Sequence, residues 1–202
     1  MKKESSGMFD KMEPQKRELL DKYADLVVRY NSIFDLTSAS NKDDFIENHI
    51  EDALLALDAI RKLIPEKCEV FYDLGSGCGV PGIPLAICME DKQAVLVERG
   101  SRRADFLSLC AASLGLGKRV HVVKTDIGEI YDQIGFAVSR AVGQFEEMEE
   151  RLYDSLSHGG TLVIYKGRLD KTEKTCFSYF RNIDVVRLDS KNKERCLLVL
   201  RK

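Results

Sequence analysis

The sequence predicts an α/β fold in which a seven-stranded, mostly parallel sheet carries helices on both faces and ends in an antiparallel hairpin. Seven short runs rich in β-branched residues follow Pro65. The first five are separated by segments long enough for a helix, as in parallel sheets, and the last two lie close together, as in a hairpin. The predicted strands cover residues 70–74, 94–98, 119–123, 135–139, 160–165, 183–188 and 196–200.

Two amphipathic helices are predicted before the first strand. From Pro14 to Phe34 the apolar residues recur at helical spacing, and Pro14 suits the first turn of a helix. Asn41 is the expected N-cap of a second helix, whose apolar stripe runs to Ile60 and stops before Pro65. We therefore expect residues 1–64 to form a helical extension packed on a core domain of residues 65–202.

The helices between the strands are predicted from "RRADFLSLCAASLGLG" and "FEEMEERLYDSLSHGG". Each segment follows a predicted strand and has the length and apolar spacing of a helix. Gly159 and Gly160 are expected to form the turn from the second of these helices into the fifth strand.

The composition is that of a soluble globular protein, with 44% hydrophobic and 32% charged residues among 202. The apolar stretches are too short for a membrane span, and no apolar core follows the N-terminal lysines, as a secretory signal would require. The six cysteines form no CxxC pair, and the three histidines are isolated in the sequence. We therefore expect a cytoplasmic protein with reduced cysteines, no metal and no membrane partner.

The net charge of −2 conceals an asymmetry along the chain. Residues 1–60 carry 8 basic and 13 acidic side chains, whereas residues 161–202 carry 11 basic and 5 acidic ones. A basic C-terminal region fits a polyanionic partner, and it fits a solvated lysine-rich surface equally well.

A glycine-rich loop follows the first predicted strand in "VFYDLGSGCGVPGIPLAI", residues 70–87. Asp73 precedes glycines at positions 75, 77 and 79, and Val80 stands where the dinucleotide fingerprint G-x-G-x-x-G needs its third glycine. The acidic-x-G-x-G-x-G pattern instead resembles the first motif of S-adenosylmethionine-dependent methyltransferases. Because glycine lets a ligand approach the main chain, we expect cofactor contacts along this loop at Asp73, Gly75, Ser76 and Gly77. A loop that serves only the fold is the alternative.

The second predicted strand ends in Glu98, 23 residues after Gly75. A carboxylate at this position can accept hydrogen bonds from both hydroxyl groups of a ribose. The alternative is an ion pair with Arg99 or Arg102. The loop after the third strand holds Thr125-Asp126-Ile127-Gly128. In methyltransferases generally this loop holds adenine, and the resemblance of the glycine loop to theirs implies that Asp126 or the N–H of Gly128 bonds the base and that Ile127 covers its face.

From about Tyr30 to the C-terminus, the chain resembles the RsmG family of bacterial 16S ribosomal RNA guanine-N7 methyltransferases, also called glucose-inhibited division protein B. "YNSIFDLTSASNKDDFIENHIEDALLAL" is similar to a family segment, with His49 and Asp52 at matching places. The loop "DLGSGCGVPGIPLAI" matches as well, including the unusual PGIP. "VERGSRRADFL", "VSRAV", "YKG" and "ERCLLVLRK" follow in the family's order and spacing.

The resemblance implies a Rossmann-like class I methyltransferase that uses S-adenosyl-L-methionine and acts as a monomer on 16S ribosomal RNA or the small ribosomal subunit particle. It implies cofactor contacts at Gly75, Val80, Ile127, Gly128 and Arg140, with Glu98 at the ribose. Three residues depart from the family pattern, which more often has Asp at Glu98, Met at Tyr165 and Arg at Asp126.

The predicted chemistry needs no general base, because guanine N7 carries a lone pair and no proton. Positioning would then dominate the catalysis. Arg140 is predicted to orient the cofactor or the guanine O6 edge, and Lys166 to lie at the reaction centre or on RNA phosphates. Further phosphate contacts are expected from Arg99, Arg102, Arg103, Arg168, Lys171, Lys174 and Arg195. A salt bridge for Arg140, ordinary surface charges for the others and a packed core position for His49 are the alternatives.

Two other functions remain open from the sequence. One is methylation of a small molecule or a protein by an enzyme of the same fold, which the acidic first third of the chain favours. The other is a non-catalytic nucleotide-binding or redox-sensing module with an NAD-like ligand.

Overall fold

A computed structural model describes residues 7–130, 133–140, 145–167, 177–189 and 194–202. It confirms the predicted fold class: seven strands form one sheet in the order β3-β2-β1-β4-β5-β7-β6, and β7 alone runs antiparallel to its two neighbours. The strands are β1 (Val70–Leu74), β2 (Gln93–Val97), β3 (Val120–Val123), β4 (Ile134–Arg140), β5 (Leu156–Lys166), β6 (Asn182–Leu188) and β7 (Arg195–Arg201).

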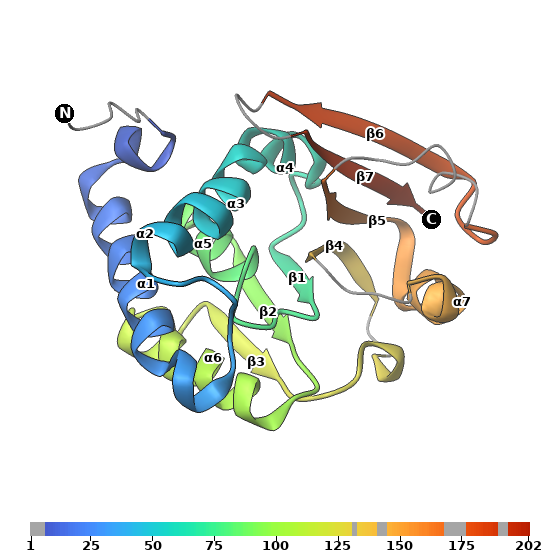
Figure 1. The fold of residues 1–202 in the computed structure, drawn as a ribbon. Helices are drawn as coiled ribbons and strands as arrows, with labels where there is room; N and C mark the ends of the chain where they lie inside the picture. The colour runs from blue at the N-terminus through green and yellow to red at the C-terminus, as the bar shows by residue number, and fades with distance from the viewer. Residues whose placement is uncertain (1–6, 131–132, 141–144, 168–176, 190–193) are drawn as a thin grey trace.

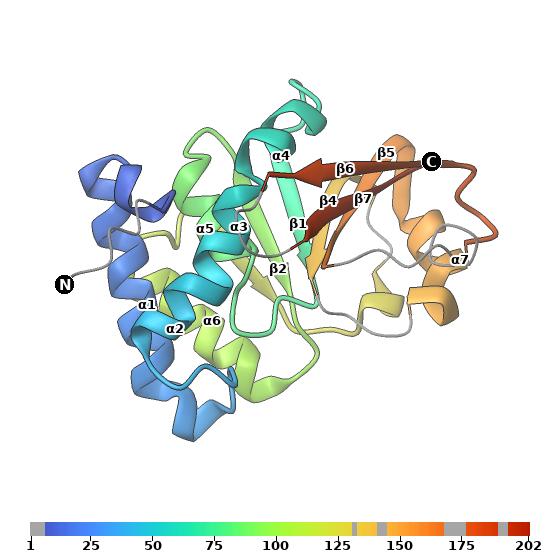
Figure 2. The same ribbon diagram turned by 45° about the horizontal axis from the view of Figure 1, so that its top comes forward.

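The described helices lie on both faces of this sheet, as Figure 1 shows. The α-helices are α1 (Pro14–Phe34), α2 (Lys42–Phe45), α3 (Glu51–Leu55), α4 (Leu57–Leu63), α5 (Gly82–Cys88), α6 (Ser101–Ser113) and α7 (Phe145–Ser155). The first six cover one face and α7 covers the other, an arrangement that the tilted view in Figure 2 also shows. Short 3₁₀ turns occupy Phe9–Lys11 and Ile127–Glu129.

The second predicted helix is interrupted in the structure. Asn41 caps its start as expected, its side chain accepting a hydrogen bond from the N–H of Asp44 at 3.0 Å. A π-helical segment, Ile46–Ile50, then separates α2 from α3, and a further break at Ala56 separates α3 from α4. Such π segments are frequent at functional sites because they redirect the side chains of one turn.

The helix-to-strand turn expected at Gly159 and Gly160 is wrong, because the helix gives way to the strand four residues earlier. The helix α7 ends at Ser155, and both glycines lie inside β5, which begins four residues earlier than predicted. Ile134 of β4 pairs with Leu156, whereas Phe136 pairs with Thr161, so β5 carries extra residues between the two pairs. Gly159 has a φ of 76°, which suits this irregular stretch.

Two hydrophobic clusters stabilise the sheet, one on each face. The larger cluster packs α1 and the segments up to α6 onto the sheet, with Tyr23, Phe45, Phe71, Phe106 and Phe136 fully buried at its centre. The smaller cluster lies under α7 and includes Leu152, Leu162, Phe180 and Leu198. Burial of large aromatic side chains on the first face therefore ties the N-terminal helices to the strands that carry the glycine loop.

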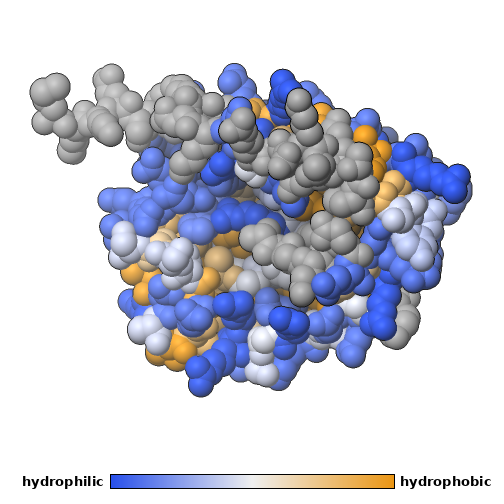
Figure 3. Space-filling view, turned by 45° about the vertical axis from the view of Figure 1, so that its right-hand side comes forward, coloured by the Kyte–Doolittle hydropathy of each residue, from blue (hydrophilic) through white to orange (hydrophobic). Residues whose placement is uncertain are grey.

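The surface outside these clusters is mainly polar. Figure 3 shows one face on which hydrophilic residues dominate the described surface and hydrophobic residues appear in patches between them. Within the described ranges, every helix is too short or too polar to cross a bilayer.

Candidate active site

A cavity of about 630 Å³ opens at the carboxyl ends of β1, β2 and β4. The strand order reverses at β1, and ligands of open α/β sheets bind at this kind of position. Eight of the residues expected to bind the cofactor line it: Gly75, Ser76, Gly77, Val80, Glu98, Asp126, Ile127 and Arg140. Asp73, Gly128 and Lys166 are not among the lining residues.

Main-chain hydrogen bonds set the start of the glycine loop. The N–H groups of Gly75 and Ser76 both donate to the carbonyl of Val97 at 2.9 Å, which joins the loop to the end of β2. The hydroxyl of Ser76 donates to the carbonyl of Asp73 at 2.8 Å. Gly75 and Gly77 have φ angles of 75° and 57°, in the left-handed region that favours glycine. The loop therefore presents bare main chain to the cavity.

The remaining glycines of the motif serve packing. A Cβ on Gly79 would lie 2.8 Å from Ile83 Cγ1 and 3.1 Å from the hydroxyl oxygen of Tyr23. A Cβ on Gly82 would lie 2.5 Å from Asp73 Oδ2. The PGIP continuation thus needs its glycine because α5 begins directly against the Asp73 carboxyl group.

Asp73 lies beneath the loop and is fully buried. Its Oδ2 accepts a hydrogen bond from the N–H of Gly82 at 3.0 Å, and its Oδ1 has no partner among the described residues. Burial raises the pKa of this carboxyl group to about 7. The expected direct cofactor contact of Asp73 is therefore replaced in the structure by a supporting position under the loop.

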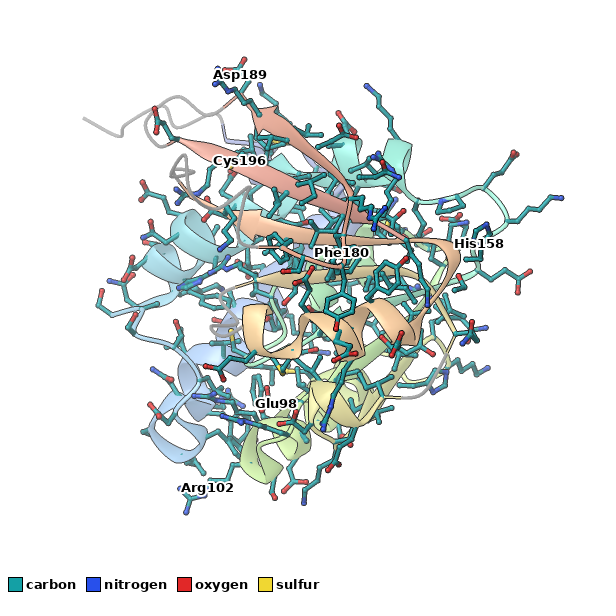
Figure 4. All side chains as sticks on the ribbon, turned by 90° about the vertical axis from the view of Figure 1, so that its right-hand side faces the viewer. Glu98, Arg102, His158, Phe180, Asp189 and Cys196 are labelled. Carbon is teal, nitrogen blue, oxygen red and sulfur yellow. The ribbon has the colours of Figure 1, made fainter. Side chains whose placement is uncertain are left out.

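Glu98 closes one side of the cavity and is 6% exposed. Its Oε2 accepts from the N–H of Gly77 at 2.9 Å, and its Oε1 accepts from the N–H of Gly100 at 2.7 Å. Arg102 points outward, away from Glu98, in the side-chain view of Figure 4, and Arg99 pairs with a different carboxylate. Glu98 therefore forms an ion pair with neither Arg99 nor Arg102, which was the alternative to a ribose site.

The loop after β3 is organised around Asp126. Its Oδ1 accepts a hydrogen bond from the N–H of Gly128 at 3.0 Å, and its Oδ2 lies 3.5 Å from Nη1 of Arg99. The N–H of Gly128, expected to be accessible to a ligand, is therefore used within the loop. Ile127 lines the cavity, as an apolar contact for a flat ring requires.

Arg140, at the end of β4, lies where the cavity meets the N-terminal helices. Its Nη1 donates to the carbonyl of His49 at 3.4 Å, and its Nη2 contacts His49 Nδ1. The other ring nitrogen of His49 lies 3.2 Å from the hydroxyl of Thr37, and the ring stacks on Phe45 with centroids 5.0 Å apart. His49 therefore forms part of the cavity wall, in addition to packing against the core.

Several lining residues come from the N-terminal part of the chain and were not expected at the site: Leu36, Thr37, Ser38 and His49. The family resemblance included this segment, but no motif in it indicates contact with a cavity. Met148 of α7 also lines the cavity, from the opposite face of the sheet, and was not singled out either.

Lys166, at the end of β5, lines a second cavity of about 460 Å³. Arg140 lines both cavities, so the two adjoin at its side chain. Of the other expected phosphate contacts, Arg99 and Arg103 line the first cavity and Arg195 lines the second. Arg168, Lys171 and Lys174 lie outside the described residues.

The cysteines and histidines of the described chain form no metal centre. Cys68, Cys78, Cys88, Cys110 and Cys196 are free thiols, and no described group of three or more His, Cys, Asp or Glu side chains could hold a metal ion. Cys176 lies outside the described residues. Cys78 lines the first cavity, but burial raises the pKa of its thiol, which disfavours a thiolate nucleophile.

Solved methyltransferase structures share this fold. The chain superposes on the METTL16 MTase domain with a TM-score of 0.60 at 14% identity, covering 92% of this chain and 79% of that one. It also superposes on an RNA methyltransferase from Salinibacter ruber in complex with S-adenosyl-L-homocysteine, with a TM-score of 0.52 at 17% identity over 75% of this chain and 88% of that one.

Two relatives with similar sequences belong to one methyltransferase family. Ribosomal RNA small subunit methyltransferase G of Brachyspira hyodysenteriae is 33% identical over 201 residues, covering 94% of this chain and 93% of the relative. The protein of that name from Borrelia duttonii is 32% identical over 184 residues, covering 88% and 85%. The family model described as rRNA small subunit methyltransferase G matches residues 16–195. The chain therefore belongs to the rRNA small subunit methyltransferase G family.

Proposed function

We propose that this protein transfers a methyl group from S-adenosyl-L-methionine to N7 of a guanine in 16S ribosomal RNA. The observation that carries the proposal is the glycine-loop cavity with Glu98 in its wall, in a chain whose relatives are named for methylation of small-subunit ribosomal RNA. We further propose a cytoplasmic monomer that acts without a metal ion on the RNA or on the small subunit particle.

The residues of the first cavity fit this cofactor. Its volume of about 630 Å³ lies in the range of cavities that enclose small ligands. The bare main chain at Gly75 and Gly77 gives room for the methionine part of the cofactor. Each oxygen of Glu98 accepts one main-chain hydrogen bond, which leaves lone pairs for the two ribose hydroxyl groups.

The adenine would lie against Ile127, with the loop after β3 holding its edge. The side chain of Asp126 already binds the N–H of Gly128, and it lies close to Arg99. Asp126 and Gly128 would therefore act by shaping this loop, so that Ile127 faces the cavity. Val80 would complete the apolar lining beside the glycine loop.

The chemistry depends on geometry more than on acid–base groups. When bound, S-adenosyl-L-methionine supplies an electrophilic methyl group, and guanine N7 supplies its own lone pair. Guanine N7 carries no proton, so the reaction needs no general base. His49, the histidine in the cavity wall, already contacts Arg140 and the hydroxyl of Thr37. Arg140 would hold the O6 edge of the guanine, and Lys166 would lie beside the same base, so both act by orientation and charge.

Mapping N7-methylguanine in 16S ribosomal RNA tests this function. RNA from cells with and without the gene should differ at one guanine, and wild-type protein should restore the methyl group. The Arg140→Ala variant should restore little of it. Transfer of labelled methyl groups to a metabolite or a protein, with none in 16S RNA, would overturn the proposal.

A further inference from the structure

The second cavity brings opposite charges together from distant parts of the chain. Its wall includes Asp52 of α3, Arg195 of β7 and Lys166 of β5, and it meets the first cavity at Arg140. Its volume of about 460 Å³ is again that of a small-ligand site. The proposed mechanism uses the Arg140 and Lys166 sides of this cavity and leaves the carboxylate of Asp52 without a role.

Asp52 is held in a defined orientation. Arg195 Nε donates to its Oδ1 at 3.0 Å, and the two side chains are only 20% and 23% exposed. Arg195 thus offsets the cost of placing a carboxylate in a partly enclosed site. The other oxygen, Oδ2, has no hydrogen-bond donor among the residues that the structure describes.

We propose that the second cavity holds the target guanine and that Asp52 recognises its Watson–Crick edge. The inference rests on the proposed function and adds the residue that selects guanine over other bases. A carboxylate offers two acceptors side by side, and guanine presents two donors side by side, N1–H and the 2-amino group. Adenine presents an acceptor at N1, which a carboxylate repels.

The positions of the two cavities agree with the order of atoms around the purine ring. N7, O6, N1 and the 2-amino group follow one another along its edge. A base with N7 toward the first cavity places O6 at the shared wall, where Arg140 lies, and turns N1 and the 2-amino group toward Asp52. Enzymes that modify a base generally take it out of its stack into such a pocket.

A substrate with inosine at the methylated position tests the inference, because inosine lacks only the 2-amino group. Wild-type protein should methylate the guanine substrate with a kcat/KM roughly 10-fold to 100-fold above that of the inosine substrate. The Asp52→Ala variant should bring this ratio close to one. The ratio does not depend on the fraction of folded protein, since both substrates are measured on one preparation.

Asp184→Ala is the matched control, because Asp184 also pairs with an arginine of β7, Arg201, but outside the cavity. It should keep the wild-type ratio. If Asp52→Ala keeps that ratio as well, Asp52 only supports the fold and the inference is wrong.

A second measurement separates the inference from the proposed function. Guanosine and inosine 5′-monophosphates are titrated into protein saturated with S-adenosyl-L-homocysteine, which fills the first cavity. A preference for the guanosine nucleotide that disappears in Asp52→Ala supports the inference even if no methyl group reaches 16S RNA, a result that overturns only the proposed function. Methylation of 16S RNA with an unchanged nucleotide preference in Asp52→Ala overturns only the inference.

Discussion

The guanidinium group of Arg140 contacts both the main-chain carbonyl and the ring Nδ1 of His49, 91 residues earlier in the chain. This contact joins the end of β4 to the π-helical segment Ile46–Ile50. It lies at the wall between the two cavities, so it fixes the group that faces both the proposed cofactor and the proposed base.

Replacing Arg140 by alanine should reduce methyl transfer to 16S RNA by roughly 100-fold or more, because a preorganised donor at the reaction centre is lost. Incorporation of tritiated methyl groups measures the rate, and thermal unfolding measures the fold, which should be retained. Arg201→Ala is the control, since Arg201 ends β7 away from both cavities. Near-normal turnover in Arg140→Ala would make this arginine a structural residue.

Replacing Gly75 by valine should abolish binding of S-adenosyl-L-homocysteine in calorimetry, because the side chain fills space at the loop. The matched control is Gly115→Val: Gly115 has a φ of 69°, close to the 75° of Gly75, and nothing lies within 4 Å of a Cβ built on it. Both variants carry similar backbone strain, but only the first should lose the cofactor. Equal affinity in the two variants would place the cofactor elsewhere.

Replacing Glu98 by glutamine should weaken S-adenosyl-L-homocysteine binding by roughly 10-fold to 100-fold, since hydrogen bonds to a charged group are worth about 1.5–3 kcal/mol. The variant also disturbs the contacts to Gly77 and Gly100 that shape the loop. Calorimetry measures the affinity. Glu90→Gln, at an exposed position outside the cavity, is expected to bind as wild type does; an equal loss there would argue against the ribose assignment.

Asp73 should make folding stability depend on pH. Burial raises its pKa in the folded state to about 7, from the ordinary 3.8 of an aspartate side chain. Its protonated form is therefore favoured by folding, and the stability that this form contributes is lost as the pH rises through 7. Relative to Asp73→Asn, the wild-type free energy of unfolding should fall by up to about 1.4 kcal/mol per pH unit from pH 5 to 7 and then level off.

Urea unfolding of both proteins at pH 5, 6, 7 and 8 measures this difference. The comparison cancels the titration of the other groups, which the two proteins share. A constant difference across this range would show that Asp73 keeps an ordinary pKa in the folded protein.

Replacing Gly82 by alanine should destabilise the fold by about 1–3 kcal/mol, the usual cost of overpacking. The new Cβ would lie 2.5 Å from both Asp73 Oδ2 and Leu96 Cδ2. Gly117→Ala is the control, because nothing lies within 4 Å of a Cβ at that position. Chemical unfolding of the two variants gives the comparison, and equal stability would mean that α5 can shift away from Asp73 without cost.

Local patterns in the sequence predict most of the fold. The strands are recognisable because β-branched runs alternate with helical segments, and six of the seven begin within one residue of their predicted positions. The start of β5 differs from the prediction because Gly159 and Gly160 suggest a turn, whereas Leu156 and Thr161 on either side of them both pair with β4. The π-helical segment Ile46–Ile50 could not be predicted from the apolar periodicity, because its apolar residues are also compatible with an α-helix.

The sequence by itself determined the fold class, the glycine loop and the carboxylate at the end of β2, because these follow from neighbouring residues along one strand and one turn. Only the tertiary structure decided that Asp73 lies beneath the loop and that His49 reaches Arg140. The same is true of the pairing of Asp52 with Arg195 across 143 residues. The physical reason is that the aromatic core packs the N-terminal helices onto one face of the sheet, and this long-range packing selects which side chains share a cavity.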